Sequence, residues 1–206
     1  YDVIVVSDEI HCDLTKPGTE YIPFASVDDT CRDISVTCIA PTKTFNLAGL
    51  QTAAVYAENS ILHHRMWRQL NTDEVAEPNA FAIQATIAAF QYGEEWLDEL
   101  REYVEKNKQY VTEFLQEKIP LIHPVAGDAT YLMWLDCRKI TESGRQFVKF
   151  IRKTSGLYVS GGNQYGRGGE GFLRVNVATS KLVVEDGMQR LYESVDAWLK
   201  EEKISK

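Results

Sequence analysis

A single lysine, Lys43, lies between two threonines, and an apolar run at residues 34–39 precedes it. A lysine beside small hydroxyl side chains at the end of a strand is a candidate nucleophilic amine, able to form a Schiff base with a carbonyl group. The competing interpretation is an ordinary exposed lysine, which is the commoner situation for this residue type. The choice between them depends on which other reactive side chains share the site.

Asp8 and His11 follow the β-branched run at residues 3–6. Such a run is typical of a strand buried on both faces of a parallel sheet, which places Asp8 at the carboxyl end of that strand. A carboxylate there could keep a heteroaromatic ring nitrogen protonated, and His11 could bond a ring hydroxyl. The alternatives are an acid that caps a turn and a histidine that is simply packed.

Arg174 lies within an apolar strand pattern at residues 172–177. Burying an arginine is costly unless an anion pairs with it, and a substrate carboxylate can do so through two parallel hydrogen bonds. An internal salt bridge is the alternative. The glycine-rich residues 161–171 lack the spacing of a phosphate-binding loop and precede a strand, so they are interpreted as a mobile connection near a pocket.

The composition excludes several classes of function. The chain has 206 residues, 44% of them hydrophobic and 25% charged, as expected of a globular protein with a sizeable core. Its net charge of -8 disfavours nucleic acid or an anionic membrane as the main partner. The four cysteines have no metal-type spacing, which predicts free thiols, a cytoplasmic location and no metal site. No signal peptide or membrane-spanning run is evident.

Hydrophobic periodicity predicts two regions of different architecture. The predicted strands cover residues 3–6, 34–39, 52–56, 130–136, 157–160 and 172–177, and the predicted helices cover residues 61–69, 80–92, 94–118, 142–153 and 181–200. Asn59 and Ser60 should cap the first of these helices, Gly93 should end the second and Pro120 should stop the third. The apolar stripe of the last helix is predicted to consist of Leu182, Val183, Met188, Leu191, Val195 and Leu199. The first region is an open, mostly parallel α/β sheet with helices, and the second is a smaller α+β unit. The chain also lacks an initiator methionine and begins with Tyr1-Asp2 directly before a strand, which predicts that it starts within a longer protein.

Four segments together are similar to the class I/II aminotransferase superfamily of fold type I, pyridoxal-phosphate-dependent enzymes. They are residues 7–11 (SDEIH), 40–50 (APTKTFNLAGL), 130–136 (TYLMWLD) and 171–176 (GFLRVN), and they occur in the family's order. Within the superfamily the chain most resembles the MalY/PatB-type cystathionine β-lyases, which are carbon–sulfur lyases. The resemblance covers only about the C-terminal half of a family member.

The resemblance implies a role for five residues. Lys43 matches the Schiff-base lysine of pyridoxal 5'-phosphate, Asp8 the acid that faces the pyridine nitrogen, and Thr42 a phosphate-contacting hydroxyl. His11 stands where related aminotransferases carry a tyrosine that binds the ring hydroxyl, and this histidine favours the lyase branch. Arg174 matches the arginine that binds the substrate α-carboxylate.

The resemblance also implies a domain division and a partner. Residues 1–97 would be the C-terminal part of the large pyridoxal-phosphate-binding domain, and residues 98–206 the small C-terminal α+β domain. The family implies a homodimer at full length and a small amino acid as substrate. Two positions depart from the family pattern, because Ala40 replaces a phosphate-contacting serine and Gln51 a phosphate-binding arginine. The family's earlier cofactor contacts are absent, so this chain alone should bind the cofactor poorly and be inactive.

The expected activity is carbon–sulfur β-lysis that yields pyruvate, ammonia and a thiol. An aminotransferase that passes an amino group to a 2-oxo acid uses the same residues and is the first alternative. A non-catalytic domain that binds a protein partner or regulator is the second. These residues do not separate lysis from transamination.

Overall fold

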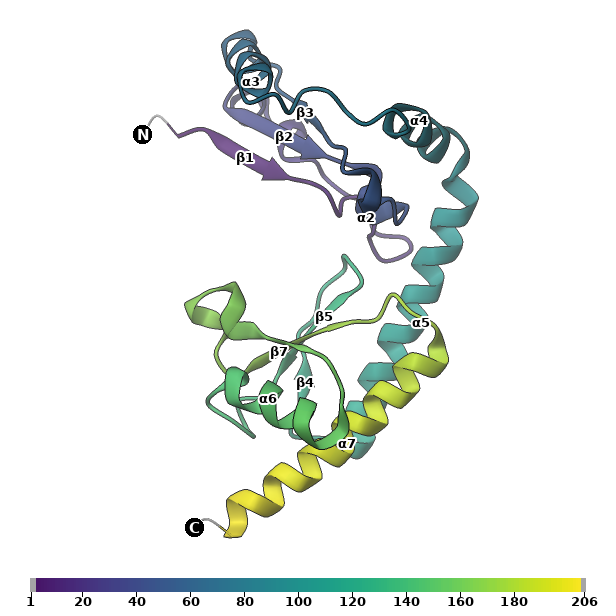
Figure 1. The fold of residues 1–206 in the computed structure, drawn as a ribbon, viewed down its shortest axis with the longest axis vertical. Helices are drawn as coiled ribbons and strands as arrows, with labels where there is room; N and C mark the ends of the chain where they lie inside the picture. The colour runs from purple at the N-terminus through teal and green to yellow at the C-terminus, as the bar shows by residue number, and fades with distance from the viewer. Residues whose placement is uncertain (1–2, 205–206) are drawn as a thin grey trace. The chain divides into compact units, whose positions relative to one another are not determined.

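The computed structural model describes residues 3–204, so Tyr1 and Asp2 lie outside the described residues. The chain divides into two compact units, Tyr1–Arg101 and Glu102–Lys206 (Figure 1). We describe each unit by itself. Their assignment to a large cofactor domain and a small domain, with a boundary after residue 97, stays a prediction.

The first unit contains a three-stranded sheet of mixed direction. Its strands are β1 (Val5–Asp8), β2 (Ser35–Ile39) and β3 (Ala54–Tyr56), in the order β1-β2-β3. β1 pairs with β2 in parallel, and β2 pairs with β3 in antiparallel fashion. The second and third strands lie within their predicted ranges, whereas the first begins two residues later than predicted, and this sheet is mixed rather than mostly parallel.

The predicted burial of the first strand on both faces is wrong in this structure. Val3 is 57% exposed, Ile4 54% and Val6 67%. β1 is an edge strand of the three, and the described chain places too little apolar surface against its faces to cover these side chains. The β-branched run has strand propensity whether or not its faces are covered, so the strand forms without the expected burial.

Helices of the first unit begin and end at recognisable signals. They are α1 (Asp29–Asp33), α2 (Pro41–Thr44), α3 (Ser60–Thr72) and α4 (Ala82–Tyr92), with the 3₁₀ turns η1 (Phe24–Ser26) and η2 (Ala48–Leu50). The Asn59 side chain caps α3 by accepting hydrogen bonds from the backbone N–H groups of Ile61 and Leu62. Gly93 ends α4, as the sequence predicted.

Helix α5 (Glu94–Lys118) has the predicted bounds and continues from the first unit into the second. Within the second unit it buries Val104, Val111 and Leu115 at helical spacing. The buried Asn107 side chain donates to the carbonyl oxygens of Val177, at 2.9 Å, and Thr179, at 3.0 Å. Those bonds hold the chain that follows the last strand of the second unit against α5.

The second unit is a four-stranded antiparallel sheet with two further helices. Its elements are β4 (His123–Pro124), β5 (Leu132–Asp136), α6 (Gly144–Ser155), β6 (Ser160–Gly161), β7 (Phe172–Asn176) and α7 (Lys181–Ile204), and the strand order is β4-β5-β7-β6. Leu135 of β5 and Leu173 of β7 are register partners, and both are fully buried. Phe147 of α6 and Leu191 of α7 are fully buried as well. This α+β arrangement agrees with the predicted architecture.

The apolar stripe of α7 differs from the predicted one at its start. Leu182 is 76% exposed and Val183 55%, whereas Val184, Met188 and Leu191 are buried. A stripe that begins at residue 184 keeps the four-, three- and four-residue steps through Val195, so one face of the helix is buried continuously. None of the helices in the described part of the chain is long and apolar enough to cross a membrane.

Candidate active site

Asp8 and Lys43 follow neighbouring parallel strands at the same edge of the sheet. Asp8 is the last residue of β1 and lies opposite Cys38 of β2. After Ile39 the chain turns at Ala40 into the short helix α2, which carries Lys43. The carboxyl ends of parallel strands lie at the same edge of their sheet, and open α/β sheets bind their ligands at that edge. The expected placement of Lys43 beyond a strand end therefore holds, with one helical turn between strand and lysine.

One hydrogen bond ties the segment after β1 to the helix that carries the lysine. The Thr44 side chain is fully buried, and its Oγ1 donates to Asp13 Oδ2 at 2.9 Å. Asp13 lies two residues beyond His11, so this bond joins the segment of Asp8 and His11 to that of Lys43. No local sequence signal predicts this bond, because the two partners are separated by 31 positions and neither belongs to a motif.

Glu9 fixes the turn immediately after Asp8. It is only 5% exposed, and its Oε1 accepts hydrogen bonds from Ser7 Oγ at 3.0 Å and from the backbone N–H of Phe24 at 3.1 Å. Burial, followed by the Glu9 charge, raises the pKa of Tyr21 to about 12. Glu9 is therefore the acid that stabilises this turn. Its neighbour Asp8 is exposed and accepts a hydrogen bond from the Ile10 N–H at 3.2 Å.

The two residues of α2 expected to contact a cofactor differ in their exposure. The Lys43 side chain is exposed, whereas Thr42 is buried and forms no side-chain hydrogen bond within residues 3–204. The Thr42 hydroxyl could therefore donate to a phosphate oxygen without breaking an existing bond. His11 is half-buried, between these extremes.

Aromatic packing holds α2 against the helices that follow. The Phe45 ring lies 5.4 Å from that of Phe90, in an edge-to-face arrangement, and 5.9 Å from that of Trp96. Gly93 permits this contact, since a Cβ at this position would lie 2.5 Å from Phe45 Cε1. The glycine was predicted only as the end of α4, so its role in seating the Lys43 helix is a finding of the structure.

The Cys12 thiol, which follows His11 in the sequence, does not compete with Lys43 as a nucleophile. Burial, then the charge of Asp13, raises the pKa of Cys12 to about 11. The thiol form therefore dominates near neutral pH, and only the thiolate is an effective nucleophile. All four cysteines of the chain are free, in agreement with the prediction from their spacing.

Arg174 belongs to the second unit and lies on an aromatic surface. It stands in the middle of β7, opposite Trp134 of β5 and Ser160 of β6. Its guanidinium carbon lies 4.3 Å from the centre of the Tyr165 ring. No carboxylate of the described residues forms an ion pair with it, so the alternative of an internal salt bridge has no support here. Its guanidinium could bind an incoming carboxylate bidentately.

The glycine-rich segment after β6 forms two ordered turns, η3 (Gly162–Tyr165) and η4 (Arg167–Gly169). Gly162 and Gly169 bring their backbones together, because a Cβ at Gly169 would lie 2.0 Å from the Gly162 carbonyl oxygen. These glycines serve close packing of two turns, and one of the turns carries the Tyr165 ring beneath Arg174. The predicted proximity to a pocket is confirmed, since Gly161, Asn163 and Gln164 line one.

The candidate residues thus form two groups. Asp8, His11, Thr42 and Lys43 lie in the first unit, where the parallel pairing of β1 with β2 and the Asp13–Thr44 bond bring their segments together. Arg174 lies in the second. An exposed amine, an exposed carboxylate and a hydroxyl without a partner suit a ligand that carries a carbonyl, a basic ring nitrogen and a phosphate, so the first group fits pyridoxal phosphate.

The amino-acid sequence matches a known protein family and several of its members. The model of the family described as "Aminotransferase class I and II" matches residues 1–191. The chain is 40% identical over 191 residues to cystathionine beta-lyase PatB of Bacillus subtilis, covering 93% of this chain and 49% of that protein.

Two solved structures resemble the chain in fold and in sequence. Cystalysin of Treponema denticola, which contains a pyridoxal 5'-phosphate cofactor, matches with a TM-score of 0.90 and 28% identity, over 94% of this chain and 49% of that one. The pyridoxal-phosphate-bound C–S lyase of Staphylococcus hominis matches with a TM-score of 0.83 and 32% identity, over 94% and 50%. The chain thus spans about half the length of these relatives.

Proposed function

The chain belongs to the class I and II aminotransferase family, and on that premise we propose that the whole protein is a pyridoxal-phosphate-dependent carbon–sulfur β-lyase. Its substrate would be an amino acid with a sulfur substituent on the β carbon, such as cystathionine. The observation that carries the proposal is the shared sheet edge of Asp8 and Lys43, held by the Asp13–Thr44 bond. The likeness to cystathionine beta-lyase PatB and to the C–S lyase of Staphylococcus hominis supports the lyase branch.

Four of the candidate residues would bind the cofactor, each at a different group. The Lys43 amine would hold the cofactor covalently, and the Thr42 hydroxyl would donate to its phosphate. The Asp8 carboxylate would keep a proton on the ring nitrogen, and His11 would bond the ring hydroxyl. Bound pyridoxal phosphate supplies an electrophilic carbonyl and a ring that stabilises negative charge at the substrate Cα.

The substrate would be held and deprotonated by side chains of both groups. The Arg174 guanidinium would bind the α-carboxylate through two hydrogen bonds, while the Tyr165 ring beneath it restrains its plane. The Lys43 amine would remove the α-proton of the bound substrate as a general base. The Cβ–S bond then breaks, and the sulfur leaves with the bonding electron pair as a thiolate that takes up a proton. Water completes the reaction, so that cystathionine and water give homocysteine, pyruvate and ammonia.

The experiment that tests this proposal uses the full-length protein with L-cystathionine. We expect pyruvate and a free thiol in equal amounts, and a yellow protein whose cofactor borohydride attaches irreversibly to Lys43. Lys43→Ala should lower pyruvate formation by at least a thousandfold, because it removes both the covalent anchor and the base. Lys106→Ala, at an exposed lysine of α5, is the matched control and should leave the rate unchanged.

The two alternative functions, an aminotransferase and a non-catalytic binding domain, predict different results. Amino transfer to an added 2-oxo acid without pyruvate would identify an aminotransferase and overturn the lyase proposal. A colourless full-length protein that cannot be reconstituted with pyridoxal phosphate, and whose biological activity survives Lys43→Ala, would favour a non-catalytic binding domain.

A further inference from the structure

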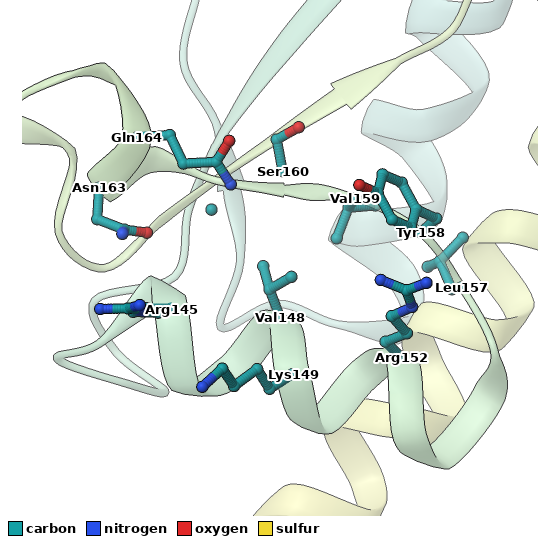
Figure 2. A pocket seen from close by; sticks show the side chains of 11 residues that line it. Arg145, Val148, Lys149, Arg152, Leu157, Tyr158, Val159, Ser160, Asn163 and Gln164 are labelled. Carbon is teal, nitrogen blue, oxygen red and sulfur yellow. The ribbon is translucent and has the colours of Figure 1, made fainter.

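A pocket of about 530 Å³ lies between helix α6, strand β6 and turn η3 of the second unit (Figure 2). Its volume is within the range of pockets that bind small molecules, and all of its lining residues lie between positions 145 and 164. None of them is among the residues to which the proposed reaction assigns a role. The pocket therefore calls for an explanation of its own.

Three cations line one wall of this pocket and no acid lines any part of it. Arg145, Lys149 and Arg152 follow one another at steps of four and three residues along α6, so they share a face of the helix. Figure 2 shows all three beside the pocket, with the Arg152 guanidinium next to Tyr158, whose ring centre is 4.9 Å away. None of the three forms an ion pair with a side chain of the described residues.

This arrangement is electrostatically unfavourable without a ligand. Like charges at three- and four-residue spacing on a helix repel one another by a few tenths of a kcal/mol per pair. The chain as a whole carries a charge of -8, and helices α5 and α7 place acids beside their cations, as Asp186 pairs with Arg190 on α7, whereas α6 contains no acid. A bound anion would relieve the repulsion along α6 and supply the missing partner charge.

A second observation points to a ligand with a hydrogen-bond donor. The Asn163 side-chain oxygen is buried and has no hydrogen-bond partner in the described part of the protein. An unsatisfied buried acceptor costs about 1–3 kcal/mol, so such groups are rare in folded proteins. In Figure 2 the Asn163 amide lies on the same side of the pocket as Arg145. Rotation of the Asn163 side chain toward the pocket would let a hydroxyl or amino group on a bound anion satisfy this oxygen.

We propose that this pocket binds a small organic anion with at least two negative charges and a hydroxyl or amino group. The cations of α6 would bind its carboxylate or phosphate groups, and Asn163 Oδ1 would accept a hydrogen bond from its donor. The apolar side chains of Val148 and Leu157 would contact its carbon skeleton. Carboxylate and phosphate groups both offer negatively charged oxygen acceptors to Arg and Lys, and titration with anions of each kind separates them.

The test is calorimetric titration of the protein with three anions at low ionic strength. Citrate has three carboxylates and a hydroxyl, tricarballylate has the same carboxylates without the hydroxyl, and glycerol 3-phosphate has a phosphate with two hydroxyls. We expect citrate to bind more tightly than tricarballylate by about fivefold, a factor that corresponds to one hydrogen bond. Tighter binding of citrate would identify a carboxylate as the anionic group of the natural ligand, and tighter binding of glycerol 3-phosphate would identify a phosphate.

Matched substitutions tie that binding to the pocket. Lys149→Gln should weaken citrate binding about fivefold, as expected for one partly screened charge, while Lys153→Gln, on the same helix outside the pocket, should not change it. Asn163→Ala should remove the preference for citrate over tricarballylate. Absence of millimolar binding by citrate and glycerol 3-phosphate would overturn the proposal. Equal effects of Lys149→Gln and Lys153→Gln would overturn it too, because a nonspecific charge effect would then suffice.

Discussion

At the scale of single residues, the candidate site depends on a buried hydroxyl rather than on the lysine itself. Lys43 is exposed and forms no ion pair within residues 3–204, so nothing in its own contacts holds its segment in place. Its neighbour Thr44 is fully buried and donates to Asp13, beyond the turn that carries Asp8 and His11. The geometry of the site is therefore set by a pair of residues to which the sequence analysis gave no role.

Thr44→Val tests this interpretation, since it keeps the shape of the side chain and removes its hydroxyl. Loss of a hydrogen bond to a charged group that is partly exposed should lower the free energy of unfolding by about 1–2 kcal/mol. Urea unfolding followed by tryptophan fluorescence measures the change. Thr44→Ser should retain most of the stability because it keeps the donor.

The control for that substitution is Thr72→Val on α3. The Thr72 hydroxyl donates to the Arg68 carbonyl within its own helix and is exposed, so its loss should change stability by no more than about 0.5 kcal/mol. If Thr44→Val were as mild as Thr72→Val, the Asp13–Thr44 bond would not be what joins the two segments.

At the scale of secondary-structure elements, a glycine allows the lysine helix to pack against the helices that follow. Gly93 ends α4 immediately before α5 begins, and the Phe45 ring occupies the space that a side chain at this position would need. Phe45 follows Lys43 by two residues, so displacement of its ring would move α2. A substitution at Gly93 should therefore affect both stability and the site.

We predict that Gly93→Ala and Gly187→Ala have opposite effects. Gly93→Ala should destabilise the protein by about 1–3 kcal/mol, the usual cost of overpacking. Gly187 lies inside α7, where an added Cβ would meet Leu157 Cδ1 at 3.7 Å, an ordinary contact. Gly187→Ala should therefore be neutral or stabilise by up to about 1 kcal/mol through helix propensity. Thermal unfolding of the two variants compares them directly, and equal effects would contradict the packing role of Gly93.

At the scale of the whole molecule, cofactor-binding and substrate-binding candidates belong to different compact units. Four candidates lie in the first unit and Arg174 in the second. The three-stranded sheet also leaves apolar side chains exposed on β1 and β3, among them Val6 and Tyr56. The chain spans about half the length of the relatives it matches.

The division between units predicts that substrate binding and cofactor retention can be separated by mutation. Arg174→Ala should lower kcat/KM for the amino-acid substrate on the order of a hundredfold, because a bidentate, charge-assisted interaction is lost, with no loss of bound pyridoxal phosphate. Arg174→Lys should recover only part of this, because an ammonium cannot bind bidentately. Steady-state kinetics and the visible spectrum of the full-length enzyme measure the two properties.

Arg65→Ala, at an exposed position of α3, is the control for Arg174→Ala and should change neither property. Loss of the cofactor from Arg174→Ala would show that the second unit acts on the cofactor site, in conflict with the proposed division of tasks.

Most of the local architecture could be predicted from the sequence, because its signals are local. Asn59 caps α3, Gly93 ends α4, and Pro120 follows the end of α5 at Lys118. The family resemblance rested on short segments in a fixed order, and it needed no three-dimensional information. The direction of β3 and the true apolar face of α7 were harder, because pairing and burial depend on residues far away in the chain.

The amino-acid sequence by itself thus determined the family, most of the helices and strands, and the candidate residues of the site. It could do so because propensity, capping and motifs act over a few positions. Tertiary structure alone decided what surrounds those candidates. It buried Glu9 and left Asp8 exposed, and it paired Thr44 with Asp13. It placed Arg174 on the Tyr165 ring and aligned three unpaired cations along a pocket. The reason is physical, because burial, hydrogen bonding and charge pairing depend on neighbours that only folding brings together.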